Sequence, residues 1–288
     1  MKDYISLARL QQWIKNTFVF LPAFFAGRIF DFAHLSELVA GFAAFCLASS
    51  CVYTINDLAD KSADEKHPHK SKRPIASGRI VRGNAVVFAA LLGAGALLLA
   101  LWLGKMFFYI TAAYLLLNML YSVSLKHIPV LDIIIVSIGF LLRIFAGGVL
   151  AEVPISHWIV VMTFLLALFL ALAKRRDDVL IFNESGERMR KSVDGYNLEF
   201  INASMMLVAA VIVVSYIMYT LSEEVMHRIG SENIYLTTLF VIAGLLRYLQ
   251  ISFVENDSGS PTKILLYDRF IQITILGWMA SFFLLLYS

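Results

Sequence analysis

An acidic cluster at the end of a long apolar run is the part of this sequence best suited to chemistry. Asn56, Asp57, Asp60 and Asp64 stand close together where the apolar residues give way to a basic segment. If the helix continues through them, at about 100° per residue, the four side chains fall within one arc of roughly 100°. Carboxylates gathered beside an apolar segment repel each other, and a hard cation such as Mg²⁺, bridging to phosphate oxygens, relieves that repulsion. The cluster therefore predicts phosphate chemistry on a lipid; a solvated acidic loop is the alternative.

Cations follow the acidic cluster directly. Lys70, Lys72 and Arg73 precede a turn at Pro74. The planar guanidinium of Arg73 can grip a phosphate at two points, which makes it the better candidate for substrate binding. The lysines suit substrate phosphates and anionic lipid headgroups equally well, and the sequence leaves both open. An acidic metal patch followed by cations is the combination that a diphosphate requires.

A second polar segment of mixed sign begins at Lys174. It opens with Lys174 and Arg175 and continues with Asp177 and Asp178. Because the two cations continue an apolar helix, we expect them to project into the mouth of a helix bundle, and the two acids are candidates for a second metal position. The alternative is a basic anchor on the cytoplasmic side of a membrane.

Arg143 lies in the middle of an apolar segment. An unpaired guanidinium there is costly, so it needs a buried anion. Asp132 is on the same predicted helix but about three turns away, so a substrate phosphate or an acid on another helix fits better. Lys126, between two apolar segments, is expected at the mouth of the bundle.

The composition defines the elements that must position these residues. The chain has 288 residues, of which 59% are hydrophobic and 16% charged, with a mean hydropathy of +0.75. One soluble core cannot bury that much apolar surface, so the sequence predicts an all-α, polytopic membrane protein. We expect a single transmembrane domain over residues 1–288, with cytoplasmic loops at about 58–84 and 174–200. Nine transmembrane helices are predicted, at 17–34, 38–57, 85–104, 106–123, 131–150, 157–173, 201–221, 234–253 and 269–287.

Charge asymmetry predicts the orientation of the chain. With nine spans, most of the 24 Lys and Arg residues fall on the side that holds the N-terminus. That bias places the N-terminus and both long loops in the cytoplasm, with the spans in the inner or plasma membrane. Cys46 and Cys51 are expected to be packing residues, and His67 and His69 solvated ones.

Several short motifs lie in order along the chain. They are Gln12-Trp13-Ile14-Lys15-Asn16, Tyr53-Thr54-Ile55-Asn56-Asp57 with Asp60 and Asp64, His67-Pro68, Lys72-Arg73-Pro74-Ile75-Ala76-Ser77-Gly78, Tyr121-Ser122 with Leu125-Lys126, Pro129-Val130-Leu131-Asp132-Ile133, Gly139-Phe140-Leu141-Leu142-Arg143, Ala146-Gly147-Gly148 and Lys174-Arg175. Together these motifs resemble the UbiA superfamily of intramembrane prenyltransferases, and more closely its decaprenyl-phosphate phosphoribosyltransferase branch. The last third of the chain resembles the branch mainly in hydropathy.

The resemblance implies an Mg²⁺-dependent bundle of the UbiA type that transfers 5-phosphoribose from phosphoribosyl diphosphate to a polyprenyl phosphate of the decaprenyl type. It implies a role in cell-envelope biosynthesis and no nucleic-acid partner, and it leaves a homo-oligomer open. The implied catalytic and metal-binding residues are Asn56, Asp57, Asp60 and Asp64, with Asp178 as a candidate for a second ion. The implied substrate-binding residues are Lys15, Asn16, Tyr53, Lys72, Arg73, Tyr121, Lys126, Arg143, Lys174 and Arg175.

Two other functions remain open at this point. Prenyl-transferring relatives carry an Asp-rich second motif, whereas the corresponding stretch of this chain opens with cations, which suit a phosphate-bearing donor or acceptor. The adjacent Asp177 and Asp178 keep the first alternative open, which is transfer of a prenyl group from its diphosphate to an aromatic or other acceptor. A polytopic transporter with an acidic ion site is the second, although the charges cluster at one mouth and no inverted repeat is visible. Substrate-dependent release of diphosphate would separate both enzymes from a transporter.

Overall fold

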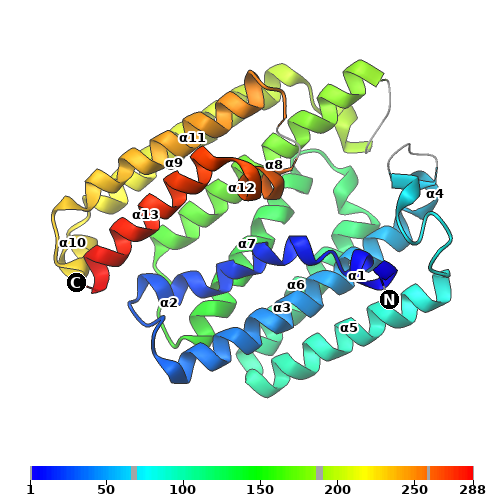
Figure 1. The fold of residues 1–288 in the computed structure, drawn as a ribbon, viewed down its shortest axis with the longest axis horizontal. Helices are drawn as coiled ribbons and strands as arrows, with labels where there is room; N and C mark the ends of the chain where they lie inside the picture. Colours follow the sequence, from blue (N-terminus) through cyan, green and yellow to red (C-terminus); the bar gives the residue numbers. More distant parts are fainter. Residues whose placement is uncertain (1, 66–69, 186–190, 258–259, 288) are drawn as a thin grey trace. The chain divides into compact units, whose positions relative to one another are not determined.

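The structure is a computed structural model that describes residues 2–65, 70–185, 191–257 and 260–287. The described residues form helices and no strand, as the continuous apolar runs predict (Figure 1). His67 and His69 lie outside them. The helices are α1 Lys2–Ala8, the 3-10 helix η1 Leu10–Phe20, α2 Leu21–Phe25, α3 Phe32–Ala59, α4 Lys61–Asp64, η2 Lys70–Lys72, α5 Arg82–Leu103, α6 Lys105–Val123, η3 Leu125–His127, α7 Leu131–Leu150, α8 His157–Ser185, η4 Lys191–Gly195, α9 Leu198–Thr220, α10 Glu223–Ile229, η5 Asn233–Thr237, α11 Thr238–Phe253, α12 Pro261–Tyr267 and α13 Arg269–Tyr287.

Seven of the described helical segments are long and apolar enough to cross a membrane, and the chain is therefore a multi-pass membrane protein. The number becomes eight if α12 and α13, which are bent by 81° at a short break, count as one span. The predicted spans at 85–104, 131–150 and 201–221 agree with α5, α7 and α9 to within a few residues.

The predicted number of nine transmembrane helices is wrong, because residues 17–34 do not form one long helix. This segment contains the end of η1, the five residues of α2 and a turn before α3 begins at Phe32. Up to Phe20 the helix is of the 3-10 type, and Leu21 donates to Phe18 three residues back rather than four. Pro22 fits in the first turn of α2, which ends at Phe25 before Gly27 takes the left-handed value φ 72°. The segment is apolar, as a transmembrane helix would be, but its residues do not form one continuous helix.

The second polar segment is also more helical than predicted. The expected start of the loop at about residue 174 is wrong, because α8 continues to Ser185. No Gly or Pro interrupts residues 174–185, and the Arg and Leu residues among them favour helix, so the apolar helix continues into the polar sequence. Lys174, Arg175 and Asp178 therefore lie on a rigid helix.

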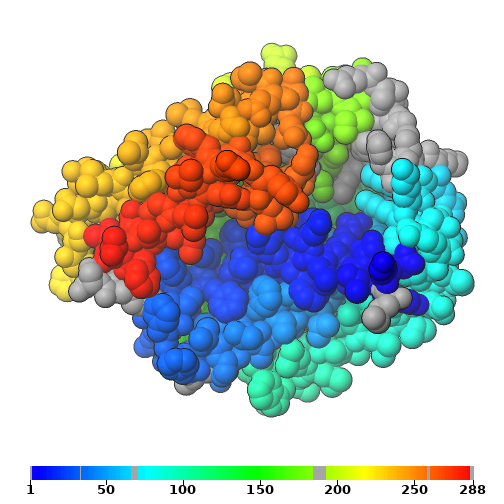
Figure 2. Space-filling model, in the orientation of Figure 1, coloured from blue at the N-terminus to red at the C-terminus, as the bar shows by residue number. Residues whose placement is uncertain are grey.

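The described chain divides into two compact units. Unit 1 comprises residues 1–126 and 138–155, and its core forms where α3 packs against α5 and α6. Buried small residues such as Ala48 and Ala96 let these helices approach, and the ring of Phe45 lies edge-on to that of Phe107 with centroids 5.9 Å apart. Figure 2 shows the segment that follows α3, coloured cyan, at the surface of this unit.

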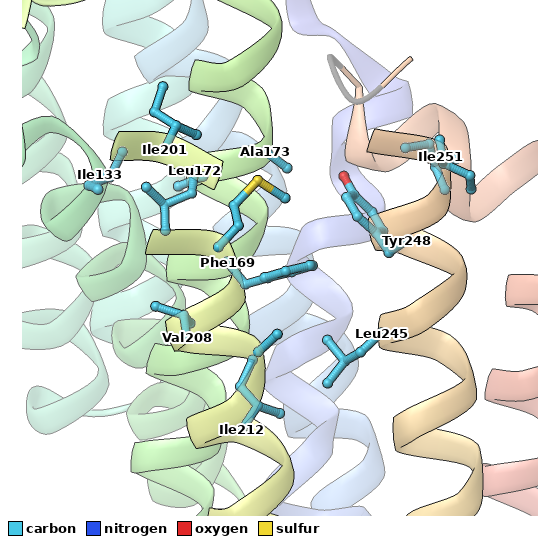
Figure 3. Close-up of a cluster of buried hydrophobic side chains, with 14 of the residues drawn as sticks. Ile133, Phe169, Leu172, Ala173, Ile201, Val208, Ile212, Leu245, Tyr248 and Ile251 are labelled. Carbon is cyan, nitrogen blue, oxygen red and sulfur yellow. The ribbon is translucent and has the colours of Figure 1, made fainter. Parts of the chain in front are cut away.

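Unit 2 comprises residues 127–137 and 156–288. Its core forms where α8 packs against α9, and α11 against α13 and α9. Figure 3 shows the buried side chains of this core, among them Phe169 and Tyr248, whose rings meet edge to face with centroids 5.3 Å apart. This core holds the polar end of α8 in place.

Candidate active site

The acidic cluster lies at the junction of α3 and α4 in unit 1. The expectation of an unbroken helix is wrong at Asp60, which precedes α4 with φ −89° and ψ 0°. The break is slight, because the N–H of Asp60 still donates to the Asn56 carbonyl at 2.9 Å and that of Asp64 to the Asp60 carbonyl at 2.8 Å. The side chains stay grouped, and Asn56 Nδ2 donates to Asp60 Oδ2 at 3.0 Å.

Two arginines contact the deepest carboxylate of the cluster. Asp57 is 3% exposed, and its Oδ1 accepts hydrogen bonds from Arg9 Nη2 at 2.5 Å and from Arg73 Nη1 at 3.1 Å. The same Nη1 of Arg73 donates to Asp64 Oδ2 at 2.6 Å. Arg73 therefore bridges two of the predicted metal ligands, which its position before Pro74 makes possible.

Lys126 closes the other side of the cluster. It is supplied by η3, directly after α6, and its side chain is 4% exposed. Its Nζ lies 2.5 Å from Asp60 Oδ1 and 3.3 Å from Asn56 Oδ1. Charge-assisted bonds to three cations thus hold the four predicted ligands together in unit 1, where carboxylates alone would repel one another.

The oxygen atoms of this cluster are of the kind that binds a hard cation. In the structure, however, its carboxylates form ion pairs with arginine and lysine side chains. Carboxylate and amide oxygens are the ligands that Mg²⁺ uses in proteins. Within the described ranges, no three His, Cys, Asp or Glu side chains lie close enough together to hold one metal ion. Arg9, Arg73 and Lys126 occupy the oxygens instead, so a metal would have to share this site with three cations that could themselves pair with phosphate.

Arg143 lies on α7, buried in unit 1 and 4% exposed. Its Nε donates to Asn16 Oδ1 at 2.8 Å, Nη1 to the Gly139 carbonyl at 2.7 Å and Nη2 to Tyr114 Oη at 2.9 Å. All three acceptors are neutral, and no carboxylate among the described residues pairs with it. No acidic side chain among the described residues therefore supplies the anion that Arg143 was predicted to need.

The close approach of η1 to α7 depends on Gly147. A Cβ at this position would overlap the carbonyl oxygen of Val19, so only glycine lets the two backbones come this near. Asn16, which is fully buried, also donates to Ser49 Oγ at 3.2 Å and so links α7 to α3. This contact places Lys15 and Asn16 beside Arg143.

Lys15 forms no hydrogen bond or ion pair with another described residue. Burial, together with the nearby charges of Arg143 and Arg9, lowers the pKa of Lys15 to about 8. The lowered pKa means that the free protein loses this charge as the pH rises through about 8, well below the ordinary range for lysine. Lys15, which precedes the candidate spans, is thus a cation available for an anion.

We expect the pH profile to report this charge. If Lys15 binds a substrate phosphate, kcat/KM for that substrate should fall about tenfold per pH unit above about pH 8. Lys15→Arg should move this decline to higher pH, because a guanidinium stays charged throughout the pH range of the assay. Lys61→Arg, at an exposed lysine paired with Glu65, is the matched control. A profile that stays flat to pH 10 in the unaltered protein would remove Lys15 from substrate binding.

The other predicted residues of unit 1 have less specific surroundings. Tyr53 on α3 lies under the guanidinium of Arg9, with Cζ 5.0 Å from the ring centroid. Lys72 in η2 is exposed, and Tyr121 on α6 is half-buried. Cys46 and Cys51 are free and buried, as expected of packing residues.

The predicted residues of unit 2 lie on α8. Arg175 is 4% exposed; its Nη1 donates to Asp178 Oδ2, and its Nε lies 3.5 Å from Asp132 Oδ2. Lys174, one residue earlier, is exposed. The two neighbouring cations, which were expected to project together into the mouth of the bundle, therefore differ in their surroundings. Arg175 is buried beside two carboxylates, whereas Lys174 is exposed.

The sequence analysis did not predict Arg9 or Tyr196, and it gave Asp132 no role in the site. Arg9 and Asp132 contact predicted residues, whereas Tyr196 contacts Asp132. Arg9 reaches Asp57 across 48 positions of the chain, from a left-handed conformation with φ 52°. Tyr196 Oη donates to Asp132 Oδ1 at 2.6 Å, and burial beside this carboxylate raises the pKa of the phenol. Asp132, weighed above only as a partner for Arg143, pairs with Arg175. No local pattern marks these residues, because each contact joins distant segments.

Comparison with known proteins bears on the identity of the fold and the family. A decaprenyl-phosphate phosphoribosyltransferase from Mycolicibacterium smegmatis is 35% identical over 288 residues, covering 96% of this chain and 90% of that protein. The enzyme of the same name from Corynebacterium glutamicum is 32% identical over 96% of this chain and 84% of its own length. A UbiA homolog from Archaeoglobus fulgidus, solved with GPP and Mg²⁺ bound, superposes with a TM-score of 0.75 at 22% identity, covering 99% of this chain and 100% of that one. The family described as the UbiA prenyltransferase family matches residues 17–273, and the chain belongs to it.

Proposed function

We propose that this protein transfers 5-phosphoribose from phosphoribosyl diphosphate to a polyprenyl phosphate and releases diphosphate. The observation that carries the proposal is the concentration of cations around the acidic cluster of unit 1, where Arg9, Arg73 and Lys126 contact every carboxylate. A donor with a diphosphate and a further phosphate needs such cations. The near full-length similarity to decaprenyl-phosphate phosphoribosyltransferases supports the same reaction.

The reaction exchanges one bond at C1 of the ribose. The C1–O bond to the diphosphate breaks, its electron pair leaves with the diphosphate, and C1 becomes oxocarbenium-like. An oxygen of the lipid phosphate attacks the opposite face and forms the new C1–O bond, so inversion at C1 is expected. A phosphate oxygen is already ionised at neutral pH, so no general base is required. Catalysis is then mostly positioning and electrostatic stabilisation.

In unit 1 we assign Asn56, Asp57, Asp60 and Asp64 to the diphosphate end of the donor. Charge on the departing diphosphate would be neutralised by the Mg²⁺ that these oxygens hold when it is bound. Arg73 and Lys72 would pair with phosphates of the donor. The guanidinium of Arg73 can exchange its carboxylate partners for a phosphate at little cost, because both kinds of partner are anions.

The remaining cations of unit 1 would serve the other phosphates. Lys15 is near enough to Arg143 for that charge to lower its pKa, and neither side chain has a carboxylate partner among the described residues. Asn16 accepts a hydrogen bond from the Arg143 guanidinium and orients it. Lys126 lies on the far side of the acidic cluster. We assign these three cations to the phosphates that the diphosphate site does not hold, including that of the lipid.

In unit 2 we assign Arg175 and Lys174 to phosphates of the donor, and Asp178 to a second metal position. The basic loops would face the cytoplasm, where phosphoribosyl diphosphate is dissolved, and the spans would lie in the plasma or inner membrane. A water-soluble, densely anionic donor explains why so many cations flank the apolar helices.

The proposal is tested with purified protein in nanodiscs, Mg²⁺, polyprenyl phosphate and ribose-labelled phosphoribosyl diphosphate. We expect the label to enter the organic phase, in equal amount to the diphosphate released, and EDTA to abolish both signals. Labelled lipid that forms equally well in EDTA would refute the metal assignment.

An inert outcome would point to the other reaction of the family. If folded protein transfers no label with several lipid chain lengths, phosphoribosyl transfer is excluded, and prenyl diphosphates with aromatic acceptors become the next substrates. If the protein releases diphosphate from neither phosphoribosyl diphosphate nor a prenyl diphosphate, a transporter is the remaining class.

A further inference from the structure

The first turn of α7 contains a buried acid to which the reaction above gives no role. The side chain of Asp132 is fully buried in unit 2. Its Oδ1 accepts a hydrogen bond from Tyr196 Oη at 2.6 Å, and its Oδ2 lies 3.5 Å from Arg175 Nε. A buried carboxylate is costly unless it is paired and hydrogen-bonded, and both oxygens here face a named partner.

The segment that carries Tyr196 is fixed tightly against the start of α7. Tyr196 Oη also accepts the N–H of Val130 at 2.6 Å, and Val130 has the left-handed value φ 67°, which is rare for a β-branched residue. A Cβ on Gly195 would overlap the ring of Pro129, so only glycine permits this contact. The phenol thus has one defined position, from which it orients the carboxylate.

Asp132 in turn faces a guanidinium that has little else to orient it. Arg175 is 4% exposed and bonds through Nη1 to Asp178, one turn further along α8. Its Nε makes no hydrogen bond with another described residue. The direction in which the remaining N–H groups point therefore depends on two carboxylates, Asp178 on its own helix and Asp132 on α7.

We propose that Asp132 and Tyr196 are positioning residues, which hold the guanidinium of Arg175 in the orientation that binds a phosphate of the donor. The inference rests on the proposed function for the identity of that donor. The chain of contacts runs from the Val130 N–H to Tyr196, from Tyr196 to Asp132 and from Asp132 to Arg175. Neither positioning residue touches the substrate; each acts through the arginine.

A purely structural role predicts different behaviour. Buried ion pairs contribute little net stability compared with apolar packing, so the network is poorly explained as a staple for the loop. If Tyr196 serves only to pack the loop, its loss should lower thermal stability and leave the affinity for phosphates unchanged. If it orients Arg175, the loss should appear in the affinity for anions.

The test compares Tyr196→Phe with Tyr248→Phe. Tyr248 is buried in the same unit, as Figure 3 shows, and its hydroxyl makes no hydrogen bond with a described residue, so removing it controls for the lost oxygen alone. We expect Tyr196→Phe to raise KM for phosphoribosyl diphosphate about tenfold, the usual scale for a hydrogen bond to a charged group. The KM for polyprenyl phosphate should match that of the control. The melting temperature should be lower than that of the control, because Asp132 Oδ1 loses the hydrogen bond from Tyr196.

A double-mutant cycle separates action through Arg175 from independent action. In an Arg175→Lys background, Tyr196→Phe and Asp132→Asn should each cost less than twofold, because the group that they orient is gone. Full, additive losses in that background would overturn the proposal. A fall in melting temperature with unchanged KM values would likewise show that the network is structural.

Binding of inorganic diphosphate, measured without lipid, keeps this inference apart from the proposed function. If the unaltered protein binds diphosphate but forms no labelled lipid, the proposed reaction fails, while a tenfold weaker affinity in Tyr196→Phe still supports positioning. If the protein is active and Tyr196→Phe binds and turns over normally, positioning fails alone. An unaltered protein that binds no diphosphate overturns both.

Discussion

Replacing Asp60 with Asn is expected to lower turnover by about 10³-fold, the effect of losing several kcal/mol of charge stabilisation at a metal-assisted leaving group. The substitution keeps the size of the side chain and an oxygen that can accept the hydrogen bond from Asn56. It removes the charge, which the proposed metal site needs. The measurement is single-turnover transfer of labelled phosphoribose across a series of Mg²⁺ concentrations.

Two controls guard this result against loss of folding. Glu65→Gln removes a nearby carboxylate that pairs only with Lys61 at the surface, and it should retain full activity. Asp60→Asn leaves Lys126 buried without its closest partner, so adding Lys126→Met should recover melting temperature but not turnover. An active Asp60→Asn protein would remove Asp60 from the metal assignment.

Replacing Arg143 with Met is expected to raise KM for one of the two phosphorylated substrates about a hundredfold, while the ligand-free protein melts at the same temperature or higher. Arg143 is buried with three neutral hydrogen-bond acceptors and with aromatic rings around its guanidinium, and no carboxylate of a described residue pairs with it. An anion that binds there would supply the missing opposite charge. Methionine fills much of the volume and removes that charge. The stabilisation by the affected substrate should disappear, because a ligand raises the melting temperature only through its affinity for the folded state.

The measurement is the melting temperature with and without each substrate, alongside steady-state kinetics. Arg247→Met is a suitable control, since this arginine pairs at the surface of unit 2 with Glu255 and Asp268. If Arg143→Met melts much lower while both substrates still stabilise it and both KM values persist, Arg143 is a structural residue that braces η1 against α7.

The apolar runs predicted most of the helices, because a span needs about 20 apolar residues and a helix is the structure that satisfies its backbone there. Hence α7 and α9 lie where hydropathy placed them. The errors at residues 17–34 and 174–185 have one cause: hydropathy does not report hydrogen bonding along the backbone. Residues 17–34 are apolar, yet their helix ends at Phe25 before the left-handed Gly27, and residues 174–185 carry many polar side chains yet are helical.

The sequence by itself also predicted the residues that are proposed above for binding metal and phosphate. Asn56, Asp57, Asp60 and Asp64 were identified from their spacing on one helix, and local hydrogen bonds keep them together. Arg143 was identified because a charge in an apolar segment is costly wherever it points. The spacing of acidic residues and the presence of a charge in an apolar segment depend only on the local sequence, so they can be recognised without knowing the fold.

Only the tertiary structure decided which charges meet. Arg9 reaches Asp57 over 48 positions, Lys126 reaches Asp60 over 66, and Tyr196 reaches Asp132 over 64. Such pairings depend on how helices pack, on the close approach at Gly147 and on the left-handed conformation of Val130. The residue types alone predict none of these features. Helix formation is local, whereas the partner of a buried charge is chosen by the packing that excludes water from it.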